Sequence, residues 1–210
     1  MYKLLEKLII YAEGEGRDLL DEMANLCRLA DEEERDLRSE AYAAIRNILK
    51  IAARYGFSGN LWQSVVALYI AYNENPFSLA TERSSVPKKD VFAVRDCEVL
   101  KELFFYDFSS LDQRFKTDCF VALTNYESMS SQSDAGKVVE NFKADLIESD
   151  DFFKTISNFY SANGVGTLGL SKAFTVDVES DVPEFVPVRK LANITLSDLI
   201  GYQMQKEEAN

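Results

Sequence analysis

The sequence contains no histidine among its 210 residues. Histidine is the usual general base near neutral pH and the commonest metal ligand in proteins. Its absence excludes every histidine-dependent catalytic triad and every zinc site that needs a histidine. Any catalysis by this chain would therefore have to use carboxylates, lysine, tyrosine or cysteine.

Basic residues are scarce relative to acidic ones. Only 23 Lys and Arg stand against 35 Asp and Glu, which gives a formal net charge of −12. Nonspecific binding to nucleic acid depends on basic side chains that neutralise phosphates. We therefore expect no nucleic-acid partner.

Long hydrophobic runs and paired cysteines are also missing. The longest apolar run, residues 65–72, is far shorter than the roughly 20 residues of a membrane-spanning helix. The apolar cluster over residues 4–11 contains two charged residues, unlike a secretory leader. Cys27, Cys97 and Cys119 are far apart and form no CxxC pair, so we expect them to be buried small hydrophobes. These features predict a cytoplasmic protein with no membrane partner.

What the sequence does have is helical periodicity, which dominates residues 1–163. It predicts a mostly α fold, with a multi-helix domain over residues 1–163 and a core that contains Trp62, Tyr69 and Phe104. The expected helices cover residues 4–12, 19–30, 37–52, 61–72, 77–83, 91–105, 111–123, 138–147 and 152–160.

Capping residues and serine-rich segments mark the boundaries of these helices. Ser58 is the expected cap of the helix over 61–72, and Asn75 with Pro76 is typical of a helix start after a sharp corner. Residues 128–136 are rich in serine and are expected to form a mobile loop.

After the helical segments the pattern changes. β-branched residues, glycines and prolines predict a small β hairpin or short sheet within residues 164–192, followed by a linker helix over 193–210. Gly164, Gly166 and Gly169 match the spacing GxGxxG, but a helix enters this segment and an extended segment leaves it, which is the reverse of a dinucleotide-binding turn. We interpret these glycines as tight-turn residues.

Carboxylates are the remaining candidates for chemistry. Glu74, Glu82, Glu98 and Glu102 could supply an acid–base pair or ligands for a hard metal ion, and Glu98 and Glu102 share a helix face. Dimetal carboxylate bundles combine such residues with Glu-x-x-His, which this sequence cannot provide. A solvated acidic face is the favoured interpretation. Aromatic residues at helical spacing could line a pocket, but a core role is favoured for them; they are Tyr69, Tyr72, Phe77, Phe104, Phe105 and Tyr106.

Four stretches, taken in order, resemble a known family. They are residues 59–63 (GNLWQ), 74–83 (ENPFSLATER), 159–174 and 198–206 (DLIGYQMQK). From about residue 55 onward, the chain resembles the N-terminal region of a bacterial family of AAA-type P-loop ATPases, known only as domain of unknown function eight-fifteen. The residues that carry the resemblance are Trp62, Glu74, Asn75, Pro76, Phe77, Glu82, Gly164, Gly166, Gln205 and Lys206.

The resemblance implies that an ATPase module follows this region and that its Walker A loop lies within a few tens of residues. It also implies that Ile200, Gly201 and Tyr202 form part of the wall beside adenine, with ATP and Mg²⁺ as cofactors of the full-length protein. AAA-type motors often form rings, so the full-length protein is expected to be a ring oligomer. Because the phosphate-binding loop is missing from these 210 residues, we expect the chain by itself neither to bind ATP tightly nor to hydrolyse it.

The chain ends within the expected helix over 193–210, so we expect it to be a piece of a longer protein. Three functions stay open. The first is a non-catalytic N-terminal domain that recognises a protein partner or substrate for an ATPase. The second is a stand-alone helical enzyme that uses carboxylates and a metal ion. The third is an adaptor or scaffold with no ATPase attached.

Overall fold

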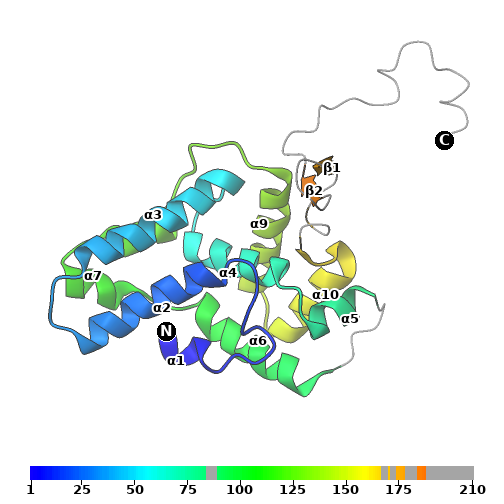
Figure 1. Cartoon of the computed structure of the whole chain (residues 1–210), viewed down its shortest axis with the longest axis horizontal. Helices are drawn as coiled ribbons and strands as arrows, with labels where there is room; N and C mark the ends of the chain where they lie inside the picture. The colour runs from blue at the N-terminus through cyan, green and yellow to red at the C-terminus, as the bar shows by residue number, and fades with distance from the viewer. Residues whose placement is uncertain (84–88, 167–169, 171–173, 178–183, 188–210) are drawn as a thin grey trace, which may run out of the picture. The chain divides into compact units, whose positions relative to one another are not determined.

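The computed structural model of the chain describes residues 1–83, 89–166 and 170, and the backbone of 174–177 and 184–187. It divides into two compact units, Met1–Leu170 and Ser171–Asn210. In its described residues the first unit consists of ten α-helices and one short 3₁₀ helix (Figure 1). The mostly α prediction is therefore confirmed.

The helices of the first unit follow one another with short connections. In chain order they are α1 (Tyr2–Leu5), α2 (Arg17–Glu32), α3 (Arg38–Tyr55), α4 (Leu61–Tyr72), α5 (Pro76–Glu82), α6 (Val91–Phe104), α7 (Ser109–Phe115), α8 (Cys119–Ala122), η1 (Leu123–Asn125), α9 (Asp134–Ile147) and α10 (Phe152–Asn163). Helices α2 to α6, α9 and α10 match expected helices to within a few residues at most ends. The helix expected over residues 4–12 is wrong, and the one expected over 111–123 is divided into α7 and α8, with Lys116 in the left-handed conformation after α7.

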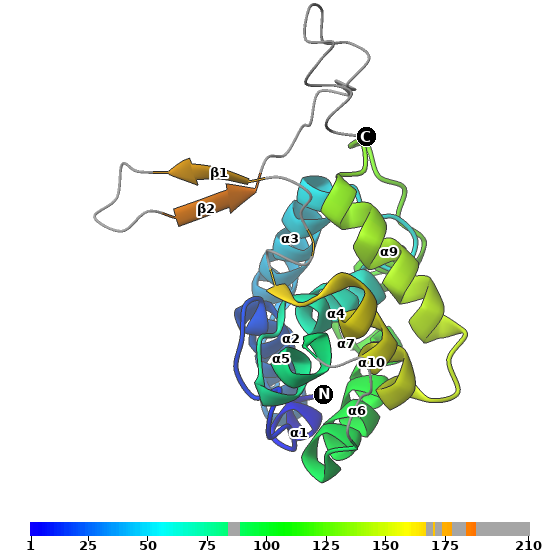
Figure 2. The same ribbon diagram turned by 90° about the vertical axis from the view of Figure 1, so that its right-hand side faces the viewer.

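Helix α4 forms the centre of the first unit. It is apolar nearly all round, and nine of its twelve residues are buried. It packs against α3, α6, α9 and α10, and both views show it among these helices (Figures 1 and 2). The expected core residues Trp62, Tyr69 and Phe104 are only 3%, 2% and 1% exposed. The Trp62 indole also donates a hydrogen bond to the Leu103 carbonyl at 2.7 Å.

The helix expected over residues 4–12 is interrupted, because α1 ends at Leu5. The backbone N–H groups of Ile9, Ile10 and Tyr11 instead donate to the carboxylate of Asp96, at distances from 2.8 to 3.1 Å. Asp96 is on α6 and is fully buried. Hydrogen bonds to a carboxylate are stronger than those between neutral groups, so this acceptor competes successfully with helical bonding. Periodicity alone could not reveal an acceptor that comes from a distant helix.

The corner before α5 forms as the sequence predicts. The Asn75 side chain accepts hydrogen bonds from the backbone N–H groups of Phe77 and Ser78, both at 2.9 Å, and the Ser78 hydroxyl accepts from the Asn75 N–H at 2.9 Å. This is a capping box with Pro76 at the first helical position. The corner is thus fixed by side chains that are adjacent in the sequence.

Two other boundaries differ from expectation. The side chain that caps α4 belongs to Asn60, not Ser58, and it accepts from the Gln63 N–H. The serine-rich segment is shorter than expected, since α9 begins at Asp134 with Ser133 as its cap. Gly136 therefore lies inside α9, where an added Cβ would come within 2.1 Å of the Tyr55 carbonyl oxygen. Close packing of α9 against the end of α3 requires glycine at this position.

In the second unit the described residues form an antiparallel pair of strands, β1 (Phe174–Asp177) and β2 (Glu184–Pro187). Phe174 lies opposite Pro187, and Asp177 lies opposite Glu184. This pair falls within the segment where a hairpin is expected. The helix expected over 193–210 lies outside the described residues.

Candidate functional site

A groove with a volume of about 660 Å³ lies between α2, α3 and α4. This volume falls within the range of ligand sites in proteins, about 300–1,000 Å³. The lining residues are Glu15, Gly16, Asp18, Leu19, Glu22, Asn47, Lys50, Ile51, Arg54, Tyr55, Val65, Leu68, Tyr69 and Tyr72. We call this feature the groove.

The two walls of the groove carry opposite charges. Glu15, Asp18 and Glu22 lie along α2 and the residues just before it, whereas Lys50 and Arg54 lie one turn apart on α3. Like charges four residues apart repel each other on a helix surface. Asp18 with Glu22, and Lys50 with Arg54, therefore place like charges side by side on the two helices.

A chain of hydrogen bonds joins the two walls of the groove between Glu22 and Lys50. The Asn47 amide donates to both carboxylate oxygens of Glu22, at 2.9 and 3.2 Å, and the Lys50 ammonium donates to the Asn47 carbonyl oxygen at 3.2 Å. The acidic and basic walls are thus connected here through a neutral amide.

Glu15, Asp18 and Arg54 are not joined in this way. Glu15, Asp18 and Arg54 are exposed, and no ion pair within the described part of the chain joins the acidic wall to the basic one. Burial is the main cause that raises the pKa of the Tyr72 hydroxyl, and smaller effects come from Glu15, which raises this pKa, and from Arg54, which lowers it. Charges of both signs therefore act on Tyr72.

The floor of the groove combines aliphatic side chains with three tyrosines. The Tyr55 hydroxyl donates to the Tyr72 hydroxyl at 3.4 Å. Burial, followed by this neighbouring hydroxyl, raises the pKa of Tyr72 above its ordinary value, so the Tyr72 hydroxyl is neutral at physiological pH. The Arg54 guanidinium lies 5.5 Å from the Tyr55 ring centroid, within the range of a cation–π contact. The floor can accept apolar groups, and the half-buried Tyr72 can offer its hydroxyl to a ligand.

Residues 9–13, which follow α1, position the rim of the groove around Glu15. The Tyr69 hydroxyl donates to the Tyr11 carbonyl at 2.5 Å, the Arg17 guanidinium to the Ala12 carbonyl at 2.6 Å, and the Asn73 amide to the Glu13 carbonyl at 2.7 Å. Asp96 holds the N–H groups of the same segment. The segment is therefore fixed from both sides, and Glu15 is held beside the start of α2.

A second charged cluster lies on another side of α4 and is closed. The Lys143 ammonium donates to the Ser58 carbonyl and the Ser64 hydroxyl, both at 2.9 Å, and pairs with Glu140 at 2.5 Å. The Ser64 hydroxyl in turn donates to Glu140 at 2.6 Å. Ser64 is fully buried and Lys143 is 7% exposed. Because these groups satisfy one another away from solvent, the cluster joins α4 to α9 rather than offering a reactive site.

Two segments that carry the family resemblance meet in space. Gly164 and Gly166 follow α10 with positive φ angles of 81° and 71°. The Glu74 side chain, at the start of the ENPFSLATER stretch, fills the place where a Cβ of Gly166 would lie, with its Oε1 2.3 Å from that position. The Phe77 ring also lies edge to face with the Tyr160 ring, with ring centroids 6.0 Å apart. This contact gives the two segments a shared structural role.

The other residues of the resemblance lie elsewhere. Trp62 is in the core, edge to face with Phe108 at 5.0 Å, and Glu82 is exposed at the end of α5. None of the described residues that carry the resemblance lines the groove. Ile200, Gly201, Tyr202, Gln205 and Lys206 are outside the described residues.

The carboxylates predicted as acid–base or metal candidates do not converge. The described residues contain no group of three or more His, Cys, Asp or Glu side chains that could hold a metal ion. Glu98 and Glu102 are exposed on α6. Cys27 and Cys97 are buried, as expected, and burial raises the pKa of Cys27 to about 11, whereas Cys119 is half-buried. No helix in the described part of the chain has the length and apolar character to cross a membrane.

Comparison with protein-family models, curated proteins and solved structures finds no match to this chain. The groove therefore has to be interpreted from its own geometry. Sequence reasoning did not identify it, although a signal was present: Asp18 with Glu22, and Lys50 with Arg54, place like charges four residues apart on two successive helices. What the sequence did not show is that these two rows face each other across the apolar surface of α4.

Proposed function

We propose that the helical unit is a non-catalytic recognition domain that binds a protein partner through the groove, and that it precedes an AAA-type ATPase in a longer protein. The observation that carries the recognition role is the pair of facing, oppositely charged walls above an apolar and tyrosine-lined floor. Exposed charges that form no ion pair in the described fold are available to a ligand.

The connection to an ATPase rests on the resemblance. Two of the stretches on which the resemblance depends meet at the contact between Glu74 and Gly166. In the longer protein, ATP and Mg²⁺ would be cofactors of the following module, with Ile200, Gly201 and Tyr202 beside adenine, and the whole would assemble as a ring.

The reading frame that encodes Asn210 tests the ATPase connection. We expect it to continue into a GxxxxGK[ST] sequence within about 40 codons. A stop codon directly after Asn210 would refute this part of the proposal and would favour an adaptor without an ATPase, because the groove would remain.

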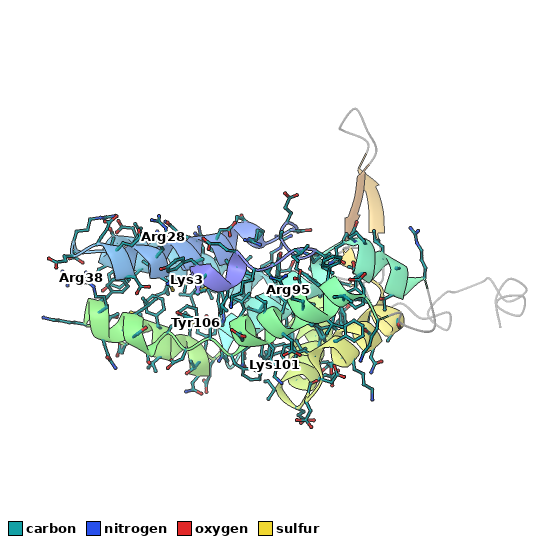
Figure 3. All side chains as sticks on the ribbon, turned by 90° about the horizontal axis from the view of Figure 1, so that it is seen from below. Lys3, Arg28, Arg38, Arg95, Lys101 and Tyr106 are labelled. Atoms are coloured by element: carbon teal, nitrogen blue, oxygen red, sulfur yellow. The ribbon has the colours of Figure 1, made fainter. Side chains whose placement is uncertain are left out.

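A matched pair of charge reversals tests the recognition role. Affinity purification from cells is compared for the unchanged chain, the variant Lys50→Glu/Arg54→Glu and the control Arg95→Glu. Arg95 is an exposed arginine on α6, which does not line the groove (Figure 3). We expect a partner that the unchanged chain and the control retain and that the groove variant loses.

The partner would then be identified by mass spectrometry, purified, and titrated against all three proteins by calorimetry. Equal affinity for the groove variant and the unchanged chain would contradict the proposal. The metal-dependent enzyme, the second function left open by the sequence, receives no specific support from the described residues.

A further inference from the structure

The chemistry of the groove restricts what can occupy it. Its acidic wall consists of Glu15, Asp18 and Glu22, and its basic wall of Lys50 and Arg54. A ligand of one sign would be attracted to one wall and repelled by the other, because like-charge juxtaposition suppresses wrong partners. Only a ligand that carries both signs, on opposite flanks, is attracted by both walls.

The floor restricts the ligand further. Leu19, Ile51 and Leu68 supply half-buried aliphatic surface between the charged walls, and the half-buried Tyr72 adds aromatic surface with a neutral hydroxyl. An occupant must therefore present apolar groups between its two charged flanks. This is the pattern of an amphipathic polypeptide segment.

The openness of the rim favours a polypeptide over a small molecule. Pockets for small ligands enclose about 70–90% of the ligand surface. Here Glu15, Gly16, Asp18, Lys50 and Arg54 are all exposed at the rim. An open trough between two helices above a third is the geometry in which an amphipathic segment lays its apolar face against a protein.

We infer that the groove binds a polypeptide segment that carries basic side chains on one flank, acidic side chains on the other, and apolar side chains between them. Its basic flank contacts Glu15, Asp18 and Glu22, its acidic flank contacts Lys50 and Arg54, and its apolar side chains reach the surface of α4. This inference rests on the proposed function, since it names the chemistry of the partner at the same site.

Selection from a displayed library of random peptides on the 210-residue chain tests it. We expect the enriched peptides to contain both acidic and basic residues that flank apolar ones. For one purified peptide, the affinity for Lys50→Glu/Arg54→Glu should fall at least about tenfold relative to the unchanged chain and to Arg95→Glu. Enriched peptides that carry charges of one sign, or none, would overturn the inference.

A charge exchange between the peptide and the groove tests the inference even if the variant Lys50→Glu/Arg54→Glu is less stable than the unchanged chain. Replacement of the acidic residues of the selected peptide by lysine should weaken its binding to the unchanged chain and restore its binding to Lys50→Glu/Arg54→Glu. Failure of the exchanged peptide to prefer the reversed groove overturns the inference.

The two proposals fail in different ways. If a cellular partner depends on the groove but the selected peptides do not have both charges, the partner chemistry is wrong and the recognition role stands. If peptides of both charges bind but no cellular partner depends on Lys50 and Arg54, the recognition role is wrong and the groove chemistry stands.

Discussion

Two sides of α4 use charge in opposite ways. Toward α9, Lys143, Glu140 and Ser64 are bonded to one another and are mostly removed from solvent. Toward α2 and α3, Lys50 and Arg54 face the acidic wall without an ion pair to it. A buried charge must be paired to be tolerated, whereas an exposed charge keeps its hydration. The first arrangement holds the helices together, and the second is available for binding.

The largest loss of stability is expected for a substitution in the Lys143 cluster, between α4 and α9. Lys143→Met removes the cation and leaves Glu140 and Ser64 without their shared partner, so the free energy of unfolding should fall by about 3–5 kcal/mol. Urea unfolding measures this. The control Lys137→Met removes an exposed lysine of the same helix and should change stability by less than about 0.5 kcal/mol. A small loss for Lys143→Met would mean that the closed cluster contributes no more than a surface pair.

A smaller loss of stability is expected for a substitution of Asp96, which binds the backbone of residues 9–11. Asp96→Asn replaces one acceptor oxygen by a donor and removes the charge that binds Ile9, Ile10 and Tyr11, so about 1.5–3 kcal/mol of stability should be lost. The matched control on α6 is Glu98→Gln, an exposed residue. Hydrogen exchange at the three amides should increase in Asp96→Asn, and protection as strong as in the unchanged chain would show that the carboxylate does not hold them.

On the floor of the groove, replacement of Tyr69 and of Tyr72 by phenylalanine should lower the free energy of unfolding by different amounts. Tyr69→Phe loses the hydrogen bond to the Tyr11 carbonyl, which is short and buried, and should cost about 1 kcal/mol. Tyr72→Phe loses only the 3.4 Å contact with Tyr55 and should cost less. Urea unfolding of both variants decides the order, and an equal or larger loss for Tyr72→Phe would contradict this account of the floor.

The smallest effect on stability is expected on the open side. Lys50→Ala and Arg54→Ala should each change the free energy of unfolding by no more than about 0.5 kcal/mol, because exposed charges contribute little to folding. The same variants should weaken partner binding. A loss of stability comparable to that of Lys143→Met would mean that these side chains belong to the fold and not to a binding surface.

Much of the fold could be predicted from local sequence, as α4 and the corner before α5 show. Eight consecutive apolar residues favour a central helix, and Asn75 with Pro76 and Ser78 fixes a helix start through neighbouring atoms. The interruption of the helix expected over residues 4–12 could not be predicted from local sequence. The backbone N–H groups of residues 9–11 donate to Asp96, which is far away in the sequence. Of the candidate site, the sequence shows the charged rows but not their arrangement.

The sequence by itself therefore determined a helical protein with an acidic surface, a central apolar helix and no histidine chemistry. Only the tertiary structure decided that two rows of opposite charge face each other across α4, and that Asp96 interrupts the first helix to position the groove rim. The reason is physical. Periodicity and capping act between residues that are close along the chain, whereas the walls of the groove and the bonds to Asp96 form only when separate helices pack together.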